Sequence, residues 1–573
     1  MQNHAHKWLI IVTFVQQCFS VDIDTPQGQI RGLTQTARNG DTFAAFLGIP
    51  FGEAPIGSLR WQKPRPYLSW EGVRDGTIHG NECLQDDVHQ PSIQTGDEDC
   101  LFLNVFTKHP GDLEAKKNVI VWIHGGAFIF GGAKIYNPEY IMEEDVVVVV
   151  IQYRLNIFGF LSTEDQNGPG NYGLWDQLEA LRWVQRNIQH YGGDPSKVTL
   201  MGMSAGGASV HYHMLSKQSH NLFHNAISLS GSSMNWWAQI RHPKKYANKL
   251  ASVVKCERGN SLEMLDCMRN IPAENLALLQ KRFFLYKSDK AYREPMNVFS
   301  PRSDPEDLES SFLPLHSFQA MKEGHINQVP YLTGYTEKEG IWRGDLLLPE
   351  EKDSPIWADY VGEFSRVFPL SLGLFGNTTD RGNDIVEKIK RFYQLDNLRE
   401  DHLTEDAIHN FIDVLSDSMF TYGIDITAKL HAERSEAPTY FYFLKYPLEH
   451  TLANFGSSGI ALPIWEPLKL ASHGTDMLLL FNMFPMFEPM SDRSEKVSRD
   501  FIKVILDFAT HGRSTIHHDW KPLQVEKPNY LVFGEQFQVV QEELPFQERI
   551  RFWESLNVFW NYEFSTSNWR DEL

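Results

Sequence analysis

The stretch Val198-Thr-Leu-Met-Gly-Met-Ser-Ala-Gly-Gly207 decides the fold, because an apolar run leads without a break into a G-x-S-x-G pentapeptide. This pattern predicts a strand that turns sharply into a helix, with Ser204 at the apex in an unusual backbone conformation. Gly202 and Gly206 lack side chains because strand and helix converge there. The helix expected over 205–215 would point its N-terminus at the serine, where negative charge is favoured. A serine between glycines is also common in ordinary turns, so the motif alone does not distinguish a nucleophilic serine from an ordinary turn, and other segments of the chain are needed.

Other apolar runs near this stretch indicate a parallel sheet. The continuous hydrophobic segments 118–123 and 146–153 are typical of strands that are covered on both faces. Residues 173–188 place apolar side chains at helical spacing, which predicts a β-α-β unit. No internal repeat, low-complexity tract or flexible linker divides the 573 residues. We therefore expect one large α/β domain over 21–569, with 300–311 as a surface excursion.

Net charge argues against a nucleic-acid-binding site, and the spacing of cysteines and histidines argues against a metal site. The formal net charge is −20, so no excess of lysine and arginine exists to replace phosphate counterions, and nucleic acid is not expected as a partner. The chain has no C-x-x-C motif and no clustered Cys/His spacing, so no metal site is expected either.

The N-terminus predicts a secretory signal peptide over residues 1–20. A lysine precedes the apolar run Trp8–Val15, and Cys18 and Ser20 fit the small residues of a cleavage site. The run is too short to span a bilayer, and no other segment approaches 18 apolar residues, so no membrane span is expected.

The remaining cysteines and the C-terminus agree with a lumenal compartment. Four cysteines allow three connectivities, and the two close pairs, Cys83–Cys100 and Cys256–Cys267, are the simplest choice. Asn377-Thr-Thr is a sequon that permits glycosylation. Residues 570–573, Arg-Asp-Glu-Leu, resemble the signals by which receptors retain lumenal proteins; a chance acidic tail is the alternative. We expect a retention receptor as partner and residence in the endoplasmic reticulum lumen.

A serine hydroxyl is a poor nucleophile until a neighbouring base removes its proton, so Ser204 needs a histidine, an orienting carboxylate and an oxyanion site. Directly after the strand expected at 118–123 stands His124-Gly-Gly-Ala-Phe128. Its glycines allow the backbone to approach the reacting centre and to turn N–H groups toward an oxyanion. Taken alone, this motif also fits an ordinary glycine turn.

Together these motifs resemble the type-B carboxylesterases of the carboxylesterase/cholinesterase family. The resemblance implies the α/β-hydrolase fold, with a large, mostly parallel central sheet and helices on both faces. It runs from Val21 to about Trp569 and also rests on four further segments: Glu98–Val105, Gly170–Gln177, Tyr191–Ser196 and Leu229–Gly231. The chain is similar to non-specific carboxylesterases resident in the endoplasmic reticulum, such as the gut esterases. It is therefore expected to be a broad-specificity serine esterase that cleaves small carboxylic esters.

The resemblance supplies the other members of a catalytic triad, which follow the serine in the order acid, then histidine. The segment Val329–Gly340 is similar to the strand and loop that carry the acid, which falls on Glu339; Glu337 in the same loop is the alternative. The segment Ser472–Asp476 is similar to the loop with the catalytic histidine, His473. The oxyanion hole is expected to consist of the backbone N–H groups of Gly126, Ala127 and Ala205.

These assignments imply a two-step mechanism that needs no metal and no organic cofactor. His473 takes the proton of Ser204 as the hydroxyl attacks an acyl carbonyl, and later returns a proton to the leaving alcohol. Glu339 holds the imidazole in the correct tautomer and stabilises its cation. A water molecule activated by the same histidine then hydrolyses the acyl-enzyme.

Two departures from the family pattern, and two alternative functions, bear on this hypothesis. Met203 precedes the nucleophile where many members have Glu, which puts a preference for cationic substrates in doubt. Ala127 replaces a glycine, a conservative change because the N–H carries the function. A cholinesterase is the nearest enzymatic alternative, but the loop from Cys83 to Cys100 has no tryptophan to hold a quaternary ammonium. The other alternative is a binding module, and such relatives typically lack the nucleophile that Ser204 provides here.

Overall fold

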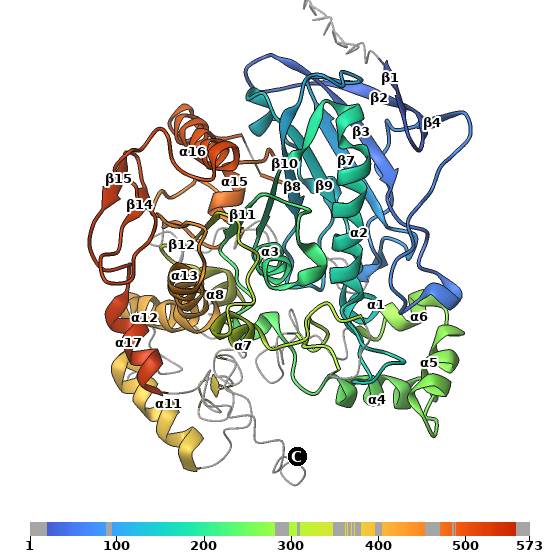
Figure 1. Cartoon of the computed structure of the whole chain (residues 1–573). Coiled ribbons are helices and arrows are strands. Elements are labelled where there is room, and N and C mark those ends of the chain that lie inside the picture. Colours follow the sequence, from blue (N-terminus) through green and yellow to red (C-terminus); the bar gives the residue numbers. More distant parts are fainter. Residues whose placement is uncertain are drawn as a thin grey trace, which may run out of the picture.

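A thirteen-stranded sheet runs through the part of the chain that the structure, a computed structural model, describes (Figure 1). The described residues are 20–86, 94–280, 297–305, 310–347, 361, 364, 368–369, 372, 380–395, 404–452, 470–483, 486–487 and 489–556. In sheet order the strands are β1 (Ser20–Thr25), β2 (Gly28–Thr36), β3 (Thr42–Pro50), β7 (Phe102–Thr107), β9 (Val147–Ile151), β8 (Lys117–Ile123), β10 (Gly193–Met203), β11 (Asn225–Leu229), β12 (Tyr331–Thr336), β13 (Thr439–Leu444), β14 (Tyr530–Phe533) and β15 (Phe537–Val540). The short strand β4 (Val73–Asp75) pairs with β2, and a separate pair is formed by β5 (Gln85–Asp86) and β6 (Gln94–Thr95).

The centre of the sheet is parallel. Every neighbouring pair from β9 to β14 runs parallel, whereas the pairs from β1 to β9 and the pair β14–β15 are antiparallel. The strand β10, which leads to Ser204, lies between β8 and β11. The predicted α/β-hydrolase architecture, a large and mostly parallel sheet, is confirmed. Its carboxyl ends are where an open α/β sheet places its ligand crevice.

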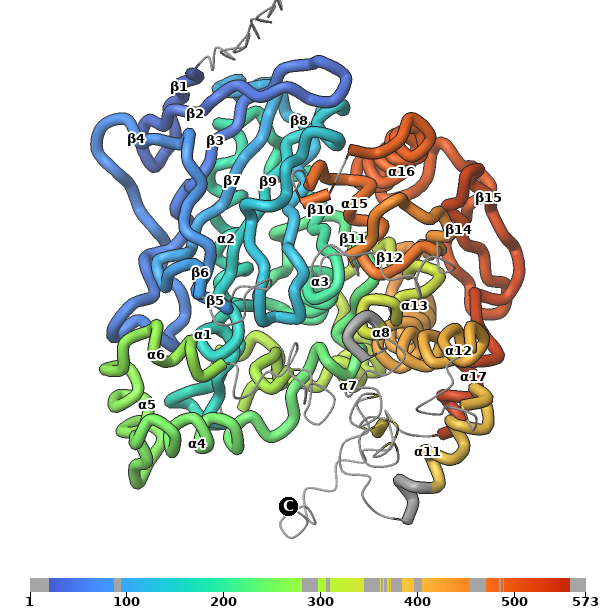
Figure 2. Tube along the Cα trace, turned by 180° about the vertical axis from the view of Figure 1, so that it is seen from behind, coloured from blue at the N-terminus to red at the C-terminus, as the bar shows by residue number. Residues whose placement is uncertain are grey.

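Helices cover both faces of this sheet. Helices α2 (Tyr172–Asn187) and α3 (Ala205–Leu215) cover the face turned to the viewer in Figure 1, and the strands lie in front of them in the view from behind in Figure 2. Along β8, Val119, Val121 and Ile123 join the apolar core of that face. Ile120 and Trp122 point the other way, into a core shared with α16 (Asp492–His511). Because successive strand residues alternate between faces, a strand covered on both sides needs a continuous apolar run.

The remaining helices surround the sheet and its carboxyl edge. A third apolar core joins α8 (Ile341–Leu347), α11 (Asp380–Phe392), α12 (Glu405–Ser416) and α17 (Gln547–Leu556). The other α-helices in the described ranges are α1 (Asn156–Phe160), α4 (Pro243–Val253), α5 (Ser261–Arg269), α6 (Ala273–Ala277), α7 (Ser317–Lys322), α13 (Tyr422–Arg434) and α15 (Thr475–Leu478). Single turns occur at η1 (Gly57–Leu59), η2 (Ala133–Ile135), η3 (Ile141–Glu143), η4 (Ile188–Tyr191), η5 (Lys217–Ser219), η6 (Trp236–Ala238) and, as a π-helix, η9 (Asp417–Thr421). Every helix in the described ranges is too short or too polar to cross a membrane.

Two disulfides cross-link the chain, with the pairing expected from the sequence. Cys83 is bonded to Cys100, and Cys256 is bonded to Cys267. The bonds close loops of 17 and 11 residues, which restricts the unfolded chain and stabilises the fold by roughly 3 kcal/mol each in the chain-entropy model.

The expectation of a surface excursion over 300–311 is wrong for its first half. Ser300 is buried, and the Asp304 carboxylate, which is 5% exposed, accepts hydrogen bonds from Asn171 Nδ2 and from the backbone N–H groups of Phe312 and Leu313. Polar residues prevail in this segment because they satisfy buried backbone donors. Other expectations fall on residues outside the described ranges: residues 1–19 of the signal peptide, the sequon at Asn377 and the C-terminal residues 570–573.

Candidate active site

Ser204 stands between β10 and α3 in the strained conformation that a sharp turn requires. Its φ of 59° and ψ of −121° lie in a region that residues with a side chain rarely adopt. A Cβ on Gly206 would lie 2.0 Å from the carbonyl oxygen of Ile123, and one on Gly202 would lie 2.5 Å from the carbonyl carbon of Gly206. The predicted convergence of strand and helix is therefore confirmed, and both glycines are needed for it.

Glu339 and His473 are joined by a short hydrogen bond. The side chain of Glu339, in the loop after β12, is fully buried, and its Oε2 lies 2.6 Å from His473 Nδ1. Its Oε1 accepts from the Ser230 hydroxyl at 2.6 Å and from the Thr336 N–H at 2.7 Å. Because donors surround both oxygens, the arrangement fits an ionised carboxylate that accepts from Nδ1–H of the imidazole. The other nitrogen of His473, Nε2, is then the one able to take up a proton.

Glu337, the alternative acid, lies elsewhere. Its side chain is partly exposed and forms an ion pair with Lys445, with Nζ and Oε1 3.7 Å apart. The structure thus brings Glu339, and not Glu337, to the imidazole.

Backbone contacts bring the three loops together. Gly231 packs so closely on Ser204 that a Cβ there would lie 2.0 Å from the serine carbonyl oxygen, and the preceding residue, Ser230, donates to Glu339. On the histidine side, a Cβ on Gly474 would lie 3.4 Å from the Cε of Met203, the residue before the nucleophile. The serine turn therefore touches both the segment that holds the acid and the loop that carries the histidine.

The acid and histidine loops are also tied to each other. The Lys338 N–H donates to the Ala471 carbonyl at 2.9 Å, and Lys338 forms a parallel β-bridge with Ser472. The residues that follow these positions are Glu339 and His473, so the bridge sets the register at which carboxylate and imidazole meet.

The predicted oxyanion loop lies against the nucleophile. A Cβ on Gly125 would lie 3.1 Å from Ser204 Cβ, and the loop follows directly after β8. Gly126 has φ 113° and Ala127 has φ 53°, so two successive residues have positive φ and bend the backbone sharply. Ala205 is the first residue of α3 and presents one of the N–H groups that have no acceptor inside the helix. The three expected donors therefore lie on the two segments that flank Ser204.

A second buried carboxylate, for which no role was predicted, lies beside Glu339. Asp476 accepts from the Tyr442 hydroxyl at 2.7 Å and lies 3.1 Å from the same Ser230 hydroxyl that donates to Glu339. Burial, and then the charge of Glu339, raise the pKa of Asp476 to about 6. Its position three residues after His473, at the start of α15, is the signal that could have indicated it.

Aromatic rings enclose the imidazole of His473. The ring of Phe420 lies 4.3 Å from it, and that of Trp342 lies 5.7 Å away, both measured between centroids. Phe420 belongs to the π-helical turn η9, a distortion that is frequent at functional sites. Both residues of the Glu339–His473 hydrogen bond are buried. No spacing in the sequence indicates Phe420, because its place depends on a helical irregularity.

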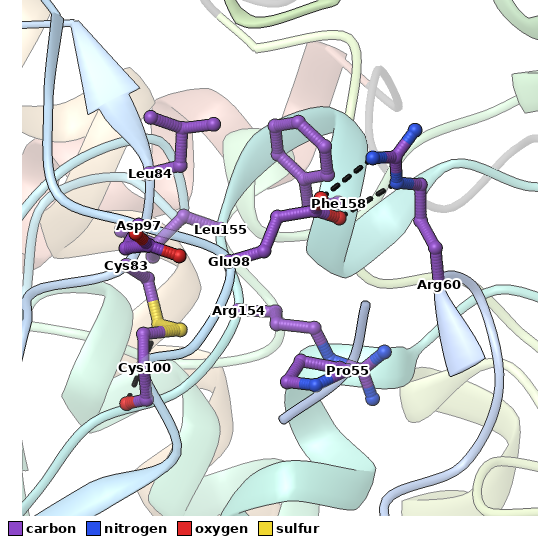
Figure 3. A pocket seen from close by; sticks show the side chains of 10 residues that line it. All are labelled: Pro55, Arg60, Cys83, Leu84, Asp97, Glu98, Cys100, Arg154, Leu155 and Phe158. Carbon is purple, nitrogen blue, oxygen red and sulfur yellow. Dashed lines mark hydrogen bonds and ion pairs between the residues drawn. A yellow bond between two sulfur atoms is a disulfide. The ribbon is translucent and has the colours of Figure 1, made fainter. Parts of the chain in front are cut away.

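The segment at 98–105 that contributes to the family resemblance has a structural role. A small cavity beside the disulfide is lined by Pro55, Arg60, Cys83, Leu84, Asp97, Glu98, Cys100, Arg154, Leu155 and Phe158 (Figure 3). Glu98 binds Arg60 through two hydrogen bonds of 2.6 Å, and both side chains are almost buried. None of the residues proposed for catalysis lines this cavity. In the described part of the chain, no group of three or more His, Cys, Asp or Glu side chains could hold a metal ion.

Comparisons with known proteins point to the same chemistry. A sequence model described as "Carboxylesterase family" matches residues 20–553. The chain is 32% identical to venom carboxylesterase-6 of Apis mellifera over 473 residues, 80% of each chain, and 32% identical to cocaine esterase of Oryctolagus cuniculus over 506 residues, 85% of this chain and 86% of the other. Among solved structures, juvenile hormone esterase from Manduca sexta, with OTFP covalently attached, superposes with a TM-score of 0.79 at 26% identity and covers 94% of this chain and 99% of that one.

Proposed function

The chain belongs to the carboxylesterase family and is a carboxylic-ester hydrolase, and we propose that it cleaves its substrates through an acyl-enzyme on Ser204. The observation that carries this proposal is the buried hydrogen bond of 2.6 Å between Glu339 and His473, on loops that touch the strained turn of Ser204. An orienter, a base and a nucleophile contributed by three loops are the arrangement that nucleophilic ester cleavage requires.

In the first half of the reaction, the Ser204 hydroxyl attacks the ester carbonyl carbon while His473 Nε2 takes its proton. Glu339 fixes the tautomer, because its Oε2 accepts from Nδ1–H and leaves Nε2 as the basic nitrogen. The alcohol leaves with the proton from His473, and the acyl group stays on Ser204. In the second half, water loses its proton to His473, attacks the acyl carbon and releases the carboxylate.

The oxyanion of each tetrahedral intermediate is bound, on this proposal, by the N–H groups of Gly126, Ala127 and Ala205. The position of the glycine loop against Ser204 Cβ, and of Ala205 at the free N-terminus of α3, supports this assignment. Removal of one oxyanion donor costs about 2.7–4 kcal/mol in other hydrolases, so three aligned donors account for a large part of the rate.

We further propose a broad ester specificity. Relatives matched at 31–32% identity carry names that refer to unlike esters, such as cocaine esterase of Oryctolagus cuniculus and juvenile hormone esterase of Tribolium castaneum, and no single one of these substrates is favoured. The uncharged side chain of Met203 beside the nucleophile gives no reason for a cationic substrate.

The proposed location is the endoplasmic reticulum lumen, reached through the signal peptide over 1–20 and held by a receptor for residues 570–573. The two disulfides support an oxidising compartment. Expression of the chain without residues 570–573 tests the location, because the shortened chain should enter the medium, whereas continued retention would contradict a receptor-read signal.

A panel of p-nitrophenyl esters of graded acyl length tests the function. The wild-type chain should hydrolyse the panel with kcat/KM values that differ by less than about tenfold per methylene, the smallest discrimination expected of a pocket that measures chain length. Ser204→Ala should lose hydrolysis of every ester while retaining its fold. Turnover by Ser204→Ala equal to that of the wild type would contradict the acyl-enzyme, and steep selectivity would contradict broad specificity.

A further inference from the structure

We propose that the side chain of His124 is a positioning residue of the oxyanion hole, because its Nδ1–H donates to the carbonyl oxygen of Gly125 and so aims the N–H of Gly126. This inference rests on the proposed function, in which Gly126 supplies one of the oxyanion donors. His124 itself touches no reacting atom on this account.

The contact that carries the inference is a hydrogen bond between neighbouring residues. His124 follows β8, is fully buried, and its Nδ1 lies 2.8 Å from the Gly125 carbonyl oxygen. A carbonyl oxygen can only accept, so Nδ1 carries the proton. The Gly125–Gly126 peptide is planar, with C=O and N–H pointing in opposite directions. Holding the oxygen of Gly125 on one side therefore directs the N–H of Gly126 to the other.

The other two donor-bearing peptides are held by backbone groups instead. The carbonyl oxygen of Gly126, in the peptide that carries the Ala127 N–H, accepts from the N–H groups of Ile129 at 2.9 Å and Phe130 at 3.1 Å. The carbonyl oxygen of Ser204, in the peptide that carries the Ala205 N–H, accepts from the Ala208 N–H at 2.8 Å.

The Gly125–Gly126 peptide is the one whose orientation most depends on a hydrogen bond such as that from His124. It joins two glycines, which rotate more freely than any other pair of residues, and Gly126 adopts a φ of 113°. A side-chain donor that grips its carbonyl oxygen removes this freedom before the substrate arrives, which is the preorganisation that an oxyanion hole depends on.

The imidazole is itself immobile. Its ring stacks on that of Tyr153, with centroids 4.4 Å apart and planes 20° apart, and the Tyr153 hydroxyl donates to the His124 carbonyl oxygen at 3.0 Å. Burial lowers the pKa of His124 to about 4, so the ring is neutral at pH 7 and keeps a single N–H.

The choice of histidine at this buried position also fits the inference. Its second nitrogen, Nε2, is buried and has no hydrogen-bond partner among the described residues. A residue retained only for packing would avoid that cost, since an apolar side chain leaves no polar atom unpaired.

Three variants at this position test the inference. In His124→Asn, the amide Nδ2 replaces the imidazole Nδ1 and can still donate to the Gly125 carbonyl, so kcat should stay within about threefold of the wild type. In His124→Gln, the amide takes the place of Nε2, and in His124→Leu no donor remains. Both should lower kcat by about 10–100-fold, less than the 100–1,000-fold loss of a whole oxyanion donor. KM should change little, because the ground-state ester does not need the donor.

A second readout separates positioning from general damage. The affinity for a trifluoromethyl ketone, which adds to the serine as a tetrahedral oxyanion, should fall in the Gln and Leu variants by the same factor as kcat. The matched control is His213→Gln, which alters another fully buried histidine, near the distal end of α3, and should leave kcat and the ketone affinity unchanged.

The outcomes are distinct. Wild-type kcat and ketone affinity in folded His124→Gln or His124→Leu would overturn the inference, and so would an Asn variant as impaired as the Gln variant. If the Gln and Leu variants do not fold, the ¹⁵N chemical shifts of the His124 imidazole in the wild-type protein show which ring nitrogen carries the proton. A proton on Nε2 in place of Nδ1 would overturn the inference. Full activity of Ser204→Ala would instead refute the proposed function.

Discussion

At the scale of the residue, the proposed chemistry depends on which side chain faces His473 Nδ1. The loop after β12 contains two glutamates, Glu337 and Glu339, and their environments alone distinguish the proposed catalytic acid from the other. Glu339 is fully buried and accepts from Ser230, Thr336 and the imidazole. Glu337 instead pairs with Lys445 at the surface. The two make a matched pair for mutagenesis, because the same chemical change can be made at both.

Glu339→Gln should reduce kcat by about four orders of magnitude, because an amide that donates to Nδ1 selects the wrong imidazole tautomer. Glu337→Gln should keep kcat within about twofold, since it removes only an exposed ion pair. Steady-state kinetics on a p-nitrophenyl ester measure both. Equal losses in the two variants, or a larger loss at Glu337, would reverse the assignment of the acid.

The serine motif predicted Ser204 as the nucleophile, and the family resemblance predicted Glu339 and His473 as its partners, but the residues around them were less accessible. Ser204 stands in a short motif whose local geometry is encoded by neighbouring glycines, whereas His473 was predicted from the resemblance of its loop to that of the family. Phe420 was not accessible, because it packs on His473 only where two segments distant in sequence meet. The start of α15 marked Asp476, but the Ser230 hydroxyl that Asp476 shares with Glu339 also comes from a distant segment. No local pattern records such a meeting.

At the scale of the element, the site is a consequence of how β8, β10 and α3 approach one another. A single residue, Ser204, lies between the end of β10 and the start of α3, so the first turn of α3 runs against the end of β8. A Cβ on Gly206 would lie 2.0 Å from the backbone carbonyl oxygen of Ile123, an atom that cannot move without distorting the sheet. Local packing thus enforces glycine at that position independently of catalysis.

Gly206→Ala should therefore destabilise the fold by more than about 3 kcal/mol, a loss at the upper end of single substitutions. Gly259→Ala is the control, because a Cβ there meets no atom within 4 Å, and it should be neutral or slightly stabilising. Urea unfolding of the two variants measures the difference. A Gly206→Ala protein as stable as the control would show that strand and helix do not converge as described.

The strands in the parallel centre of the sheet were easier to predict from the sequence than the strands at the edges of the sheet. The runs at 118–123, 146–153 and 198–203 correspond to β8, β9 and β10, and the helix expected over 205–215 is α3. The antiparallel strands β1 and β2 were not predicted, because strands with one face toward solvent alternate polar and apolar residues and give a weaker signal.

At the scale of the whole molecule, buried uncharged histidines connect stability to pH. His213 and His431 are fully buried, and burial lowers the pKa of each to about 3, far below the value near 6.5 in an unfolded chain. The contribution of these groups is complete above pH 6.5 and is lost as the pH falls toward the folded pKa, because the unfolded chain alone gains protons. Asp476, whose pKa is raised, acts in the opposite direction between about pH 4 and 6.

The free energy of unfolding should fall by about 1.4 kcal/mol per pH unit for each such histidine as the pH is lowered from 6 to 5. His213→Gln removes one of these groups, so its loss of stability over this interval should be smaller than that of the wild type by about 1.4 kcal/mol. Urea titrations at the two pH values give the comparison. Identical pH dependence in both proteins would mean that His213 is protonated in the fold.

The convergence of one hydroxyl, one imidazole and one carboxylate is tested most directly by mapping where the enzyme becomes acylated or phosphonylated. Wild-type protein is treated with a fluorophosphonate, digested and analysed by mass spectrometry, with His473→Ala and Ser204→Ala treated alongside. We predict a single adduct on the peptide that contains Ser204, much slower labelling in His473→Ala and none in Ser204→Ala. An adduct on any other residue, or an unlabelled wild-type protein, would contradict the account.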